Sequence, residues 1–259
     1  MKLHTQPASG MRAAVIASLI IFGISPVLSQ GGGSVGVSDH NTTTSALAEA
    51  GREALRRGKD TEDVKTMLLA VADLRAAVKG DPTSVANNYE LALAEYDLGV
   101  QFQQSDKQSA ELWLDRAIAD TKKTIRLDGA SSDAHTLLSD LYGTKIGLDG
   151  FWTAIRLGPK ADSELETALR LNPDNPRAHL TKGRRYLYSP RMFGGDLDKA
   201  ISSFKEATLL DPHSDDAFRW LAIALIKKGD TVLAKQAIAE AMHLNPQSRA
   251  DIELAKTIH

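Results

Sequence analysis

A short phrase, leucine followed by asparagine or aspartate and then proline, returns at intervals along the second half of the chain. It ends at Pro173, Pro212 and Pro246, and related stops stand upstream at Pro82 and Gly129. Successive stops are 47, 44, 39 and 34 residues apart. Because proline cannot continue a helix, each stop marks the end of a helical unit. Repetition at such periods predicts an array of similar helical units rather than one irregular core.

Small and apolar residues fall at matching places within these units. With Pro246 at position 32 of a 34-residue unit, Ala222 falls at position 8, Gly229 at position 15 and Ala234 at position 20. Antiparallel helices pack closely only where small residues meet, so we expect Ala222 to face Ala234 and Gly229 to make the turn. The two preceding units have small or apolar residues at the matching positions: Gly183, Tyr186, Gly195, Ala200, Phe204 and Ala207 in one, and Leu138, Tyr142, Ala161, Leu165 and Ala168 in the other.

With this pattern the chain resembles the tetratricopeptide repeat (TPR) family over about residues 46–246, most closely from residue 132 onward. The resemblance implies an all-α fold for residues 46–259, a right-handed α-solenoid of about five helical hairpins plus a C-terminal capping helix. The alternative is a non-repetitive bundle of proline-capped helices. The predicted hairpins pair 46–57 with 61–79, 84–104 with 107–127, 132–146 with 160–171, 175–188 with 196–210, and 214–228 with 231–244, and the capping helix runs from Ser248 to about Thr257.

Three of the units are longer than 34 residues, and the two longest have 13 and 10 extra residues. The extra residues of the second unit are expected to lengthen both of its helices, 84–104 and 107–127. The extra residues of the third unit, 147–159, predict a protruding loop or short helix with Phe151 and Trp152 exposed.

A further insertion, Ser-Pro-Arg-Met-Phe-Gly-Gly at 189–195, stands where a single residue normally suffices. Pro190 is expected to end the preceding helix, and Gly194 and Gly195 to allow positive φ. Residues 183–207 around it are similar to extracytoplasmic bacterial TPR proteins, some related to the T component of tripartite periplasmic solute carriers. The alternative is a well-packed elbow that holds no ligand.

Residues 1–29 have the features of a secretory signal peptide, with basic residues first and an apolar run at 13–28. Small residues precede a cleavage site expected after Ser29. The alternative is an uncleaved membrane anchor, although the run of about 16 residues is shorter than the roughly 20 that a membrane span needs. The Gly-, Ser- and Thr-rich residues 30–45 predict a flexible linker. We therefore expect the mature protein in the periplasm or cell envelope of a bacterium, without stable membrane insertion.

Composition and motifs exclude several classes of function. The 259 residues include no cysteine, which excludes disulfides, Cys-ligated zinc and thiol catalysis. With 31 basic and 33 acidic residues there is no global positive charge to hold nucleic acid. No H-E-x-x-H, G-x-S-x-G or P-loop pattern occurs, and the histidines are scattered, so we expect no catalytic residues, metal or cofactor. His135 and His179 fall at the same repeat position and are expected to lie near each other.

In the TPR family the concave face is lined by the first helix of each hairpin, at about positions 2, 5, 9, 12 and 13. The resemblance therefore implies these groove residues: Tyr89, Tyr96, Asp140, Thr144, Arg177, Arg184, Tyr188, Arg219 and Lys227. The C-terminal half of this set is basic with an aromatic beside it, which favours an extended segment that carries carboxylates. The alternative is that Arg184 pairs with Asp140 of the preceding repeat. Phe151 and Trp152 are a second candidate contact.

These observations predict a non-enzymatic extracytoplasmic TPR scaffold that binds a protein or peptide in its concave groove. The alternative is a periplasmic accessory of solute transport that binds a small ligand or a solute-binding protein.

Overall fold

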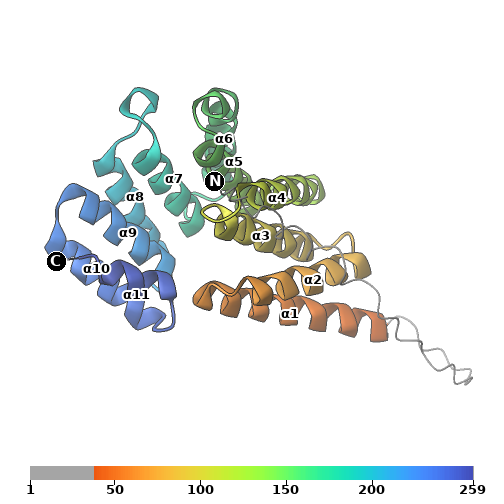
Figure 1. The fold of residues 1–259 in the computed structure, drawn as a ribbon. Helices are drawn as coiled ribbons and strands as arrows, with labels where there is room; N and C mark the ends of the chain where they lie inside the picture. Colours follow the sequence, from red (N-terminus) through yellow and green to blue (C-terminus); the bar gives the residue numbers. More distant parts are fainter. Residues whose placement is uncertain (1–37, 259) are drawn as a thin grey trace, which may run out of the picture. The chain divides into compact units, whose positions relative to one another are not determined.

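The computed structural model describes residues 38–258, which form eleven α-helices and one 3₁₀ turn with no strand among them (Figure 1). The predicted signal peptide and residues 30–37 of the predicted linker lie outside the described residues. The elements are α1 Ser38–Thr61, α2 Val64–Gly80, α3 Val85–Phe102, α4 Lys107–Leu127, α5 Ser132–Asp149, α6 Phe151–Leu171, α7 Pro176–Tyr188, η1 Arg191–Phe193, α8 Leu197–Leu210, α9 Asp215–Lys228, α10 Thr231–Leu244 and α11 Arg249–Ala255.

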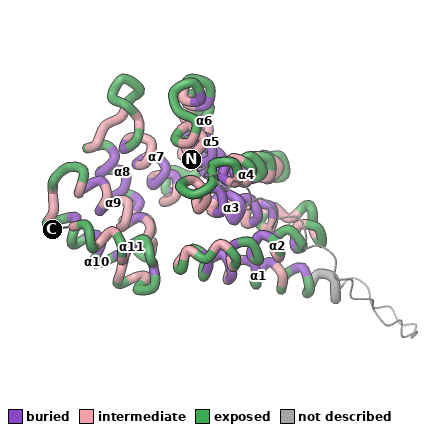
Figure 2. The backbone as a smooth tube through the Cα atoms, viewed as in Figure 1, coloured by how far each residue is buried: buried purple, intermediate pink, exposed green. Residues whose placement is uncertain are grey.

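The helices pack in consecutive antiparallel hairpins, α1 with α2 through α9 with α10, and α11 covers the last of them. Figure 2 shows the buried stretches along the seams between helices, with exposed residues on the outer faces and at the turns. This arrangement confirms the all-α solenoid of five hairpins and a capping helix. None of the helices between residues 38 and 258 combines the length and hydrophobicity that a membrane span requires.

Helix capping repeats with the hairpins. The first helix of each later unit begins after a Ser or Asn whose side chain accepts a backbone N–H: Ser84, Ser131, Asn175, Ser214 and Ser248. Four of the second helices begin after an Asp that does the same, namely Asp63, Asp106, Asp196 and Asp230, whereas α6 begins after Gly150 without a side-chain cap. These caps satisfy amide groups that a helix start leaves without partners, so they define where each helix begins.

Small residues let paired helices approach closely. A methyl group added at Gly183 of α7 would lie 2.4 Å from the Phe204 ring of α8, and one at Gly99 would lie 2.8 Å from Leu114. In the last hairpin Ala222 and Ala234 are both fully buried. The small residues that marked the repeat are therefore packing positions between the two helices of a hairpin.

The third hairpin differs from the prediction. Residues 151–159 are not a separate loop but belong to α6, which runs through Pro159 to Leu171. The reason is an uninterrupted buried face, because Thr153, Leu157, Ala161, Leu165 and Ala168 follow one another at helical spacing. The extra residues thus lengthen α5 and α6, and their turn at Gly150 projects from the array.

The start of the array also differs from the prediction. Helix α1 begins at Ser38, so residues 38–45 of the predicted linker are helical. Thr44 and Ala48 are buried, and Thr44 lies against Gly80 at the end of α2. Packing on α2 therefore orders a segment whose composition alone favours a flexible chain.

The insertion at 189–195 forms a tight elbow. Helix α7 ends at Tyr188, directly before Ser189 and Pro190. The 3₁₀ turn Arg191–Phe193 follows. Gly194 has φ +86°, as predicted, but Gly195 does not have positive φ. Gly195 is required for a different reason, since an added Cβ would lie 1.8 Å from the Ser189 carbonyl oxygen.

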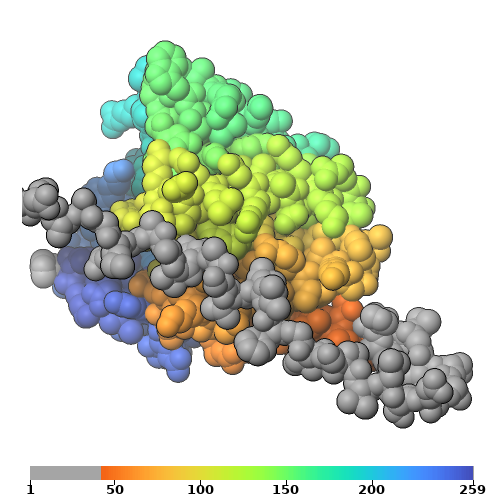
Figure 3. Space-filling model, turned by 45° about the vertical axis from the view of Figure 1, so that its right-hand side comes forward, coloured from red at the N-terminus to blue at the C-terminus, as the bar shows by residue number. Residues whose placement is uncertain are grey.

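Within residues 38–258 the first and last units of the array touch (Figures 1 and 3). The Asn245 side-chain amide donates to Asp60 Oδ1 at 2.9 Å and to Asp215 Oδ2 at 3.0 Å. Arg249 Nε lies 3.5 Å from Glu62 Oε2. The curved array therefore closes on itself through polar contacts between α1 and the α10–α11 region.

Candidate peptide-binding hollow

The concave side of the array encloses a hollow of about 1510 Å³. The first helices of the hairpins, α3, α5, α7 and α9, supply most of its wall, and α6 and the elbow complete it. The predicted groove residues that line it are Tyr96, Asp140, Thr144, Arg177, Arg184, Tyr188 and Arg219. The structure thus brings most of the predicted set to one surface.

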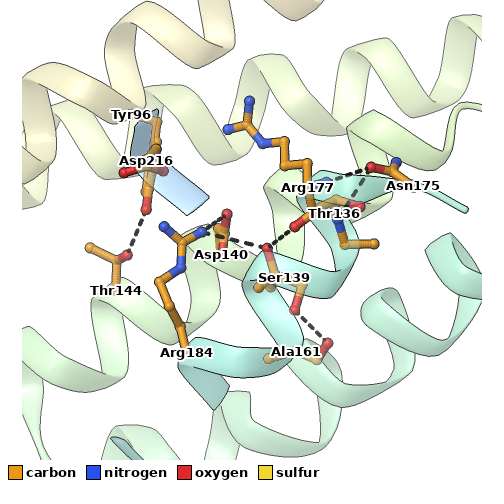
Figure 4. A network of polar contacts seen from close by, with 12 residues as sticks. Tyr96, Thr136, Ser139, Asp140, Thr144, Ala161, Asn175, Arg177, Arg184 and Asp216 are labelled. Atoms are coloured by element: carbon orange, nitrogen blue, oxygen red, sulfur yellow. Dashed lines mark hydrogen bonds and ion pairs between the residues drawn. The ribbon is translucent and has the colours of Figure 1, made fainter. Parts of the chain in front are cut away.

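Arg184 of α7 pairs with Asp140 of α5 in the wall of this hollow (Figure 4). The Nη2–Oδ2 distance is 2.5 Å, and the two side chains are 19% and 5% exposed. Burial opposes the charge on the guanidinium, but the Asp140 carboxylate outweighs it and raises the pKa of Arg184. Arg184 also lies 5.4 Å from the ring centre of Trp220. The intramolecular alternative for Arg184 is therefore confirmed, and its charge is already matched.

Arg219 of α9 is matched in the same way. It donates to Asp251 Oδ1 of α11 at 2.8 Å and also bonds to Asp216. Lys227 does not line the hollow, because its ammonium donates to the Leu187 carbonyl at 3.1 Å. These two cations join neighbouring helices, Arg219 linking α9 to α11 and Lys227 linking α9 to the end of α7.

Arg177 is the exception among the basic residues of the wall. Its Nη1 donates to the Tyr89 hydroxyl at 3.1 Å, and its guanidinium carbon lies 6.0 Å from the Tyr89 ring centre. Within residues 38–258 no carboxylate oxygen lies within 4.0 Å of it, whereas every other cation of the wall has one. Among the cations of the wall, Arg177 is therefore the one whose guanidinium can form an ion pair with an anionic group of a ligand.

Tyr89 and Tyr96 support this part of the wall as neutral phenols. Burial raises the pKa of each to about 12, and for Tyr89 this outweighs the opposing charge of Arg177. The Thr144 hydroxyl donates to the Tyr96 hydroxyl at 3.4 Å. Tyr89 does not line the hollow, but its hydroxyl accepts the hydrogen bond from Arg177.

Over the whole wall the charge is nearly balanced, whereas its α7–α9 part, the half that was predicted to be basic, has more cations than carboxylates. Six cations face five carboxylates: Lys59, Lys107, Arg177, Arg184, Arg185 and Arg219 against Asp97, Asp140, Asp162, Asp211 and Asp216. The sequence prediction missed Asp97 and Asp216, although they stand at repeat positions 13 and 2, where the family pattern places groove residues. It also missed Trp220, which stands at position 6, outside that pattern.

Aromatic rings complete the wall beside these charges. Tyr188 and Trp220 meet edge to face with ring centres 5.9 Å apart, and Tyr188 is 64% exposed. Phe151 and Trp152, the second candidate contact, do not line the hollow. They lie at the projecting turn of the α5–α6 hairpin and are 56% and 79% exposed. Phe151 and Trp152 therefore lie outside the hollow but at its edge, because Phe193, whose ring centre is 6.3 Å from that of Phe151, lines it.

The histidines have structural partners. His135 Nδ1 lies 2.6 Å from Glu164 Oε2, and its Nε2 lies 3.3 Å from the Gly129 carbonyl. His179 Nε2 lies 2.8 Å from the Pro173 carbonyl. Each ring thus bonds to the stop residue of the preceding unit, a contact that repeats along the array. In the part of the chain that the structure describes, no group of three or more His, Asp or Glu side chains is arranged to hold a metal ion.

Comparison with known proteins agrees with this architecture. Residues 194–257 match the family model of the tetratricopeptide repeat. Together with the fold, the match supports the TPR family for this chain, whose described residues form an all-α solenoid. No curated protein sequence matches the chain significantly.

Among solved structures, the chain is similar to a thermophilic TPR protein of Thermus thermophilus, with 22% identity and a TM-score of 0.59 over 80% of this chain and 98% of that one. It is also similar to PilF of Pseudomonas aeruginosa, at 18% identity and a TM-score of 0.48, over 85% of this chain and 90% of that one. YrrB, described as a TPR protein with an unusual peptide-binding site, has 18% identity and a TM-score of 0.41 over 81% and 99%. The first of these likenesses shows the fold.

Proposed function

We propose that this protein is a non-enzymatic scaffold that binds an extended segment of a partner protein in its hollow. The size of the hollow supports this proposal. At about 1510 Å³ it exceeds the roughly 300–1,000 Å³ typical of small-molecule sites. Its wall is built from successive hairpins, so an extended chain can contact several repeats in turn.

The observation that carries the proposal is the guanidinium of Arg177 on this wall, which forms no ion pair with any residue between 38 and 258. A guanidinium binds a carboxylate through two parallel hydrogen bonds, which selects an Asp or Glu side chain or a chain terminus. Tyr96, Tyr188 and Trp220 offer apolar rings with polar edges beside it. The segment we propose therefore carries one carboxylate among apolar or aromatic residues.

The test is selection from a library of random linear peptides displayed on phage, with the purified full-length chain as bait. We expect the selected peptides to share one acidic residue, and Arg177→Glu to weaken them by roughly tenfold or more because it removes a charge-assisted pair. Arg177→Lys should retain part of the affinity. Arg170→Glu changes an exposed arginine of α6 that does not line the hollow, and is the matched control.

Two results would reject this function. One is a selection in which no peptide family is enriched. The other is a family that binds Arg177→Glu and the unmodified chain equally well while circular dichroism shows both to be folded. Either result would show that the hollow is not a peptide-binding site.

We also propose that the scaffold acts outside the cytoplasm. The signal-peptide pattern of residues 1–29 and the similarity of residues 183–207 to extracytoplasmic TPR proteins support this location. Amino-terminal sequencing of the protein from a bacterial envelope fraction should read from Gln30. Recovery of the intact chain from the cytosol alone would contradict it.

A further inference from the structure

Two sequence insertions that are far apart along the chain meet at one end of the array. Phe151 and Trp152 begin α6, with ring centres 5.4 Å apart, and Phe151 lies 6.3 Å from Phe193 of the elbow. Met192 precedes Phe193 on the 3₁₀ turn. We call these four residues, Phe151, Trp152, Met192 and Phe193, the apolar tip.

The apolar tip is displayed rather than packed. Trp152 is 79% exposed and Met192 is 81% exposed, the largest exposures among the large apolar residues that the structure describes. Figure 2 shows exposed backbone both at this end of α6 and in the α7–α8 connection. The elbow is held by the close approach of Gly195 to the Ser189 carbonyl, so Met192 and Phe193 are presented on a tight turn. Grouped exposed apolar residues mark surfaces that bind something.

Cations lie close to the apolar tip in the sequence and have no ion pair among the described residues. Arg156 and Lys160 follow Trp152 along α6 at helical spacing, and Arg191 precedes Met192. All three are exposed, and none has an ion pair among residues 38–258. The chain as a whole has a formal charge of −2, so this end is locally positive on an acidic protein.

Nearby carboxylates do not offset this charge, because each is engaged elsewhere. Asp149 lies 3.1 Å from Lys107, and Asp162 lies 2.6 Å from Arg185. Asp196 caps α8 through the amides of Asp198 and Lys199. The excess positive charge around the apolar tip is therefore available to an outside partner.

We propose that the apolar tip docks on an anionic lipid surface. Trp and Phe settle at the boundary between lipid headgroups and acyl chains, and Arg and Lys beside them attract acidic headgroups. Phe193 also lines the hollow, but Trp152 and Met192 do not, and these two are the most exposed members of the tip, which suits a flat bilayer better than a peptide held in a groove. The scaffold would then hold its hollow at the membrane surface without spanning the bilayer.

The absence of cysteine makes a position-specific test possible. Met192→Cys in the full-length chain is labelled with an environment-sensitive fluorophore, and Leu209→Cys, at an exposed apolar position of α8, is the matched control. Vesicles are either phosphatidylcholine alone or an equimolar mixture with phosphatidylglycerol. We expect the emission at position 192 to shift to the blue with the mixed vesicles, and not at position 209. The label distinguishes docking of the tip from adsorption of the chain through its apolar residues 13–28.

The charge requirement is tested in the same background. Arg156→Glu, Lys160→Glu and Arg191→Glu together should weaken the response at position 192 by roughly tenfold or more. Arg126→Glu, Lys205→Glu and Lys235→Glu together change three exposed, unpaired cations elsewhere and should leave it unchanged. Added salt should weaken the response of the unmodified tip.

Each contrary outcome overturns the proposal. No shift at position 192, or equal shifts at 192 and 209, would show that the tip does not enter the lipid. Equal shifts with both vesicle types would show that docking does not require an anionic headgroup. A shift that depends on protein concentration without vesicles would assign the tip to a second copy of this chain, and one that appears only with an added acidic protein would assign it to a protein partner.

Discussion

Glu95 is a buried carboxyl group between helices of neighbouring hairpins. Its side chain is 1% exposed and lies 2.6 Å from Arg75 of α2, while its Oε2 has no hydrogen-bond partner. Burial, followed by the negative charge of Asp120, raises the pKa of Glu95 from 4.5 to about 7, and Arg75 opposes this only in part. The fold therefore favours the protonated form of this residue.

This perturbation predicts how stability depends on pH. Because the folded pKa lies above the unfolded one, the stabilising contribution is fully present below pH 4.5 and is lost as pH rises through about 7. The free energy of unfolding should fall by about 3 kcal/mol across this window, relative to Glu95→Gln, which cannot ionise. Urea unfolding of both proteins across the window measures the difference. Parallel pH profiles would mean that Glu95 does not titrate there.

The charges of the hollow show what a sequence can predict at the residue scale. Repeat position placed Tyr96, Asp140 and Arg184 on one wall, and the structure confirms their places. Pairing is harder to predict, because Arg184 and Asp140 are 44 residues apart and meet only when α5 and α7 pack side by side. The sequence therefore predicted which residues reach the hollow better than which of them are neutralised.

At the scale of elements, the helix crossings depend on the absence of a side chain. Gly183 of α7 lies against Phe204 of α8, which is itself fully buried. Gly183→Ala should lower the free energy of unfolding by about 1–3 kcal/mol, because a methyl group forces the ring or the helices apart. Thermal and urea unfolding measure this change.

The matched control is Gly147→Ala in α5, where an added methyl group meets nothing within 4 Å. That change should stabilise the protein by up to about 1 kcal/mol, through the higher helix propensity of alanine. If both substitutions had the same effect, the close approach of α7 and α8 would be refuted.

Helix boundaries were predictable wherever capping residues and stop residues agree. The 196–210 and 214–228 helices begin after Asp196 and Ser214, which are caps in the structure. The start of α6 was predicted at residue 160, after the segment 147–159, although the buried spacing from Thr153 to Leu157 and Ala161 continues through Gly158 and Pro159. Tertiary burial there outweighs a local helix-breaking residue.

At the scale of the described array, closure could not be predicted from the sequence. Each repeat specifies its contact with the next one, but Asn245 and Asp60 are 185 residues apart and meet through the summed rotation of all the hairpins. The insertions in α5, α6 and the elbow change that sum. Sequence reasoning therefore predicted a curved array but not the meeting of its ends.

Closure predicts a change in dimensions when its contacts are removed. Asn245→Ala combined with Arg249→Glu should separate α1 from the α10–α11 region, since it deletes one hydrogen bond and opposes Glu62 with a like charge. Small-angle X-ray scattering should then give a larger radius of gyration than the unmodified chain has. Lys256→Glu changes an exposed residue just beyond α11 and is the control. An unchanged radius in the double variant would refute closure in solution.

The contact between α1 and α11 has a consequence for how the array comes apart. A linear stack of repeats can fray from either terminus, since its outermost hairpins have a neighbour on one side only. When the first and last hairpins contact each other, unfolding has no free end at which to begin. Unfolding of either hairpin also removes a contact from the other. Melting of residues 38–258 should then be more cooperative than in an open stack of equal length.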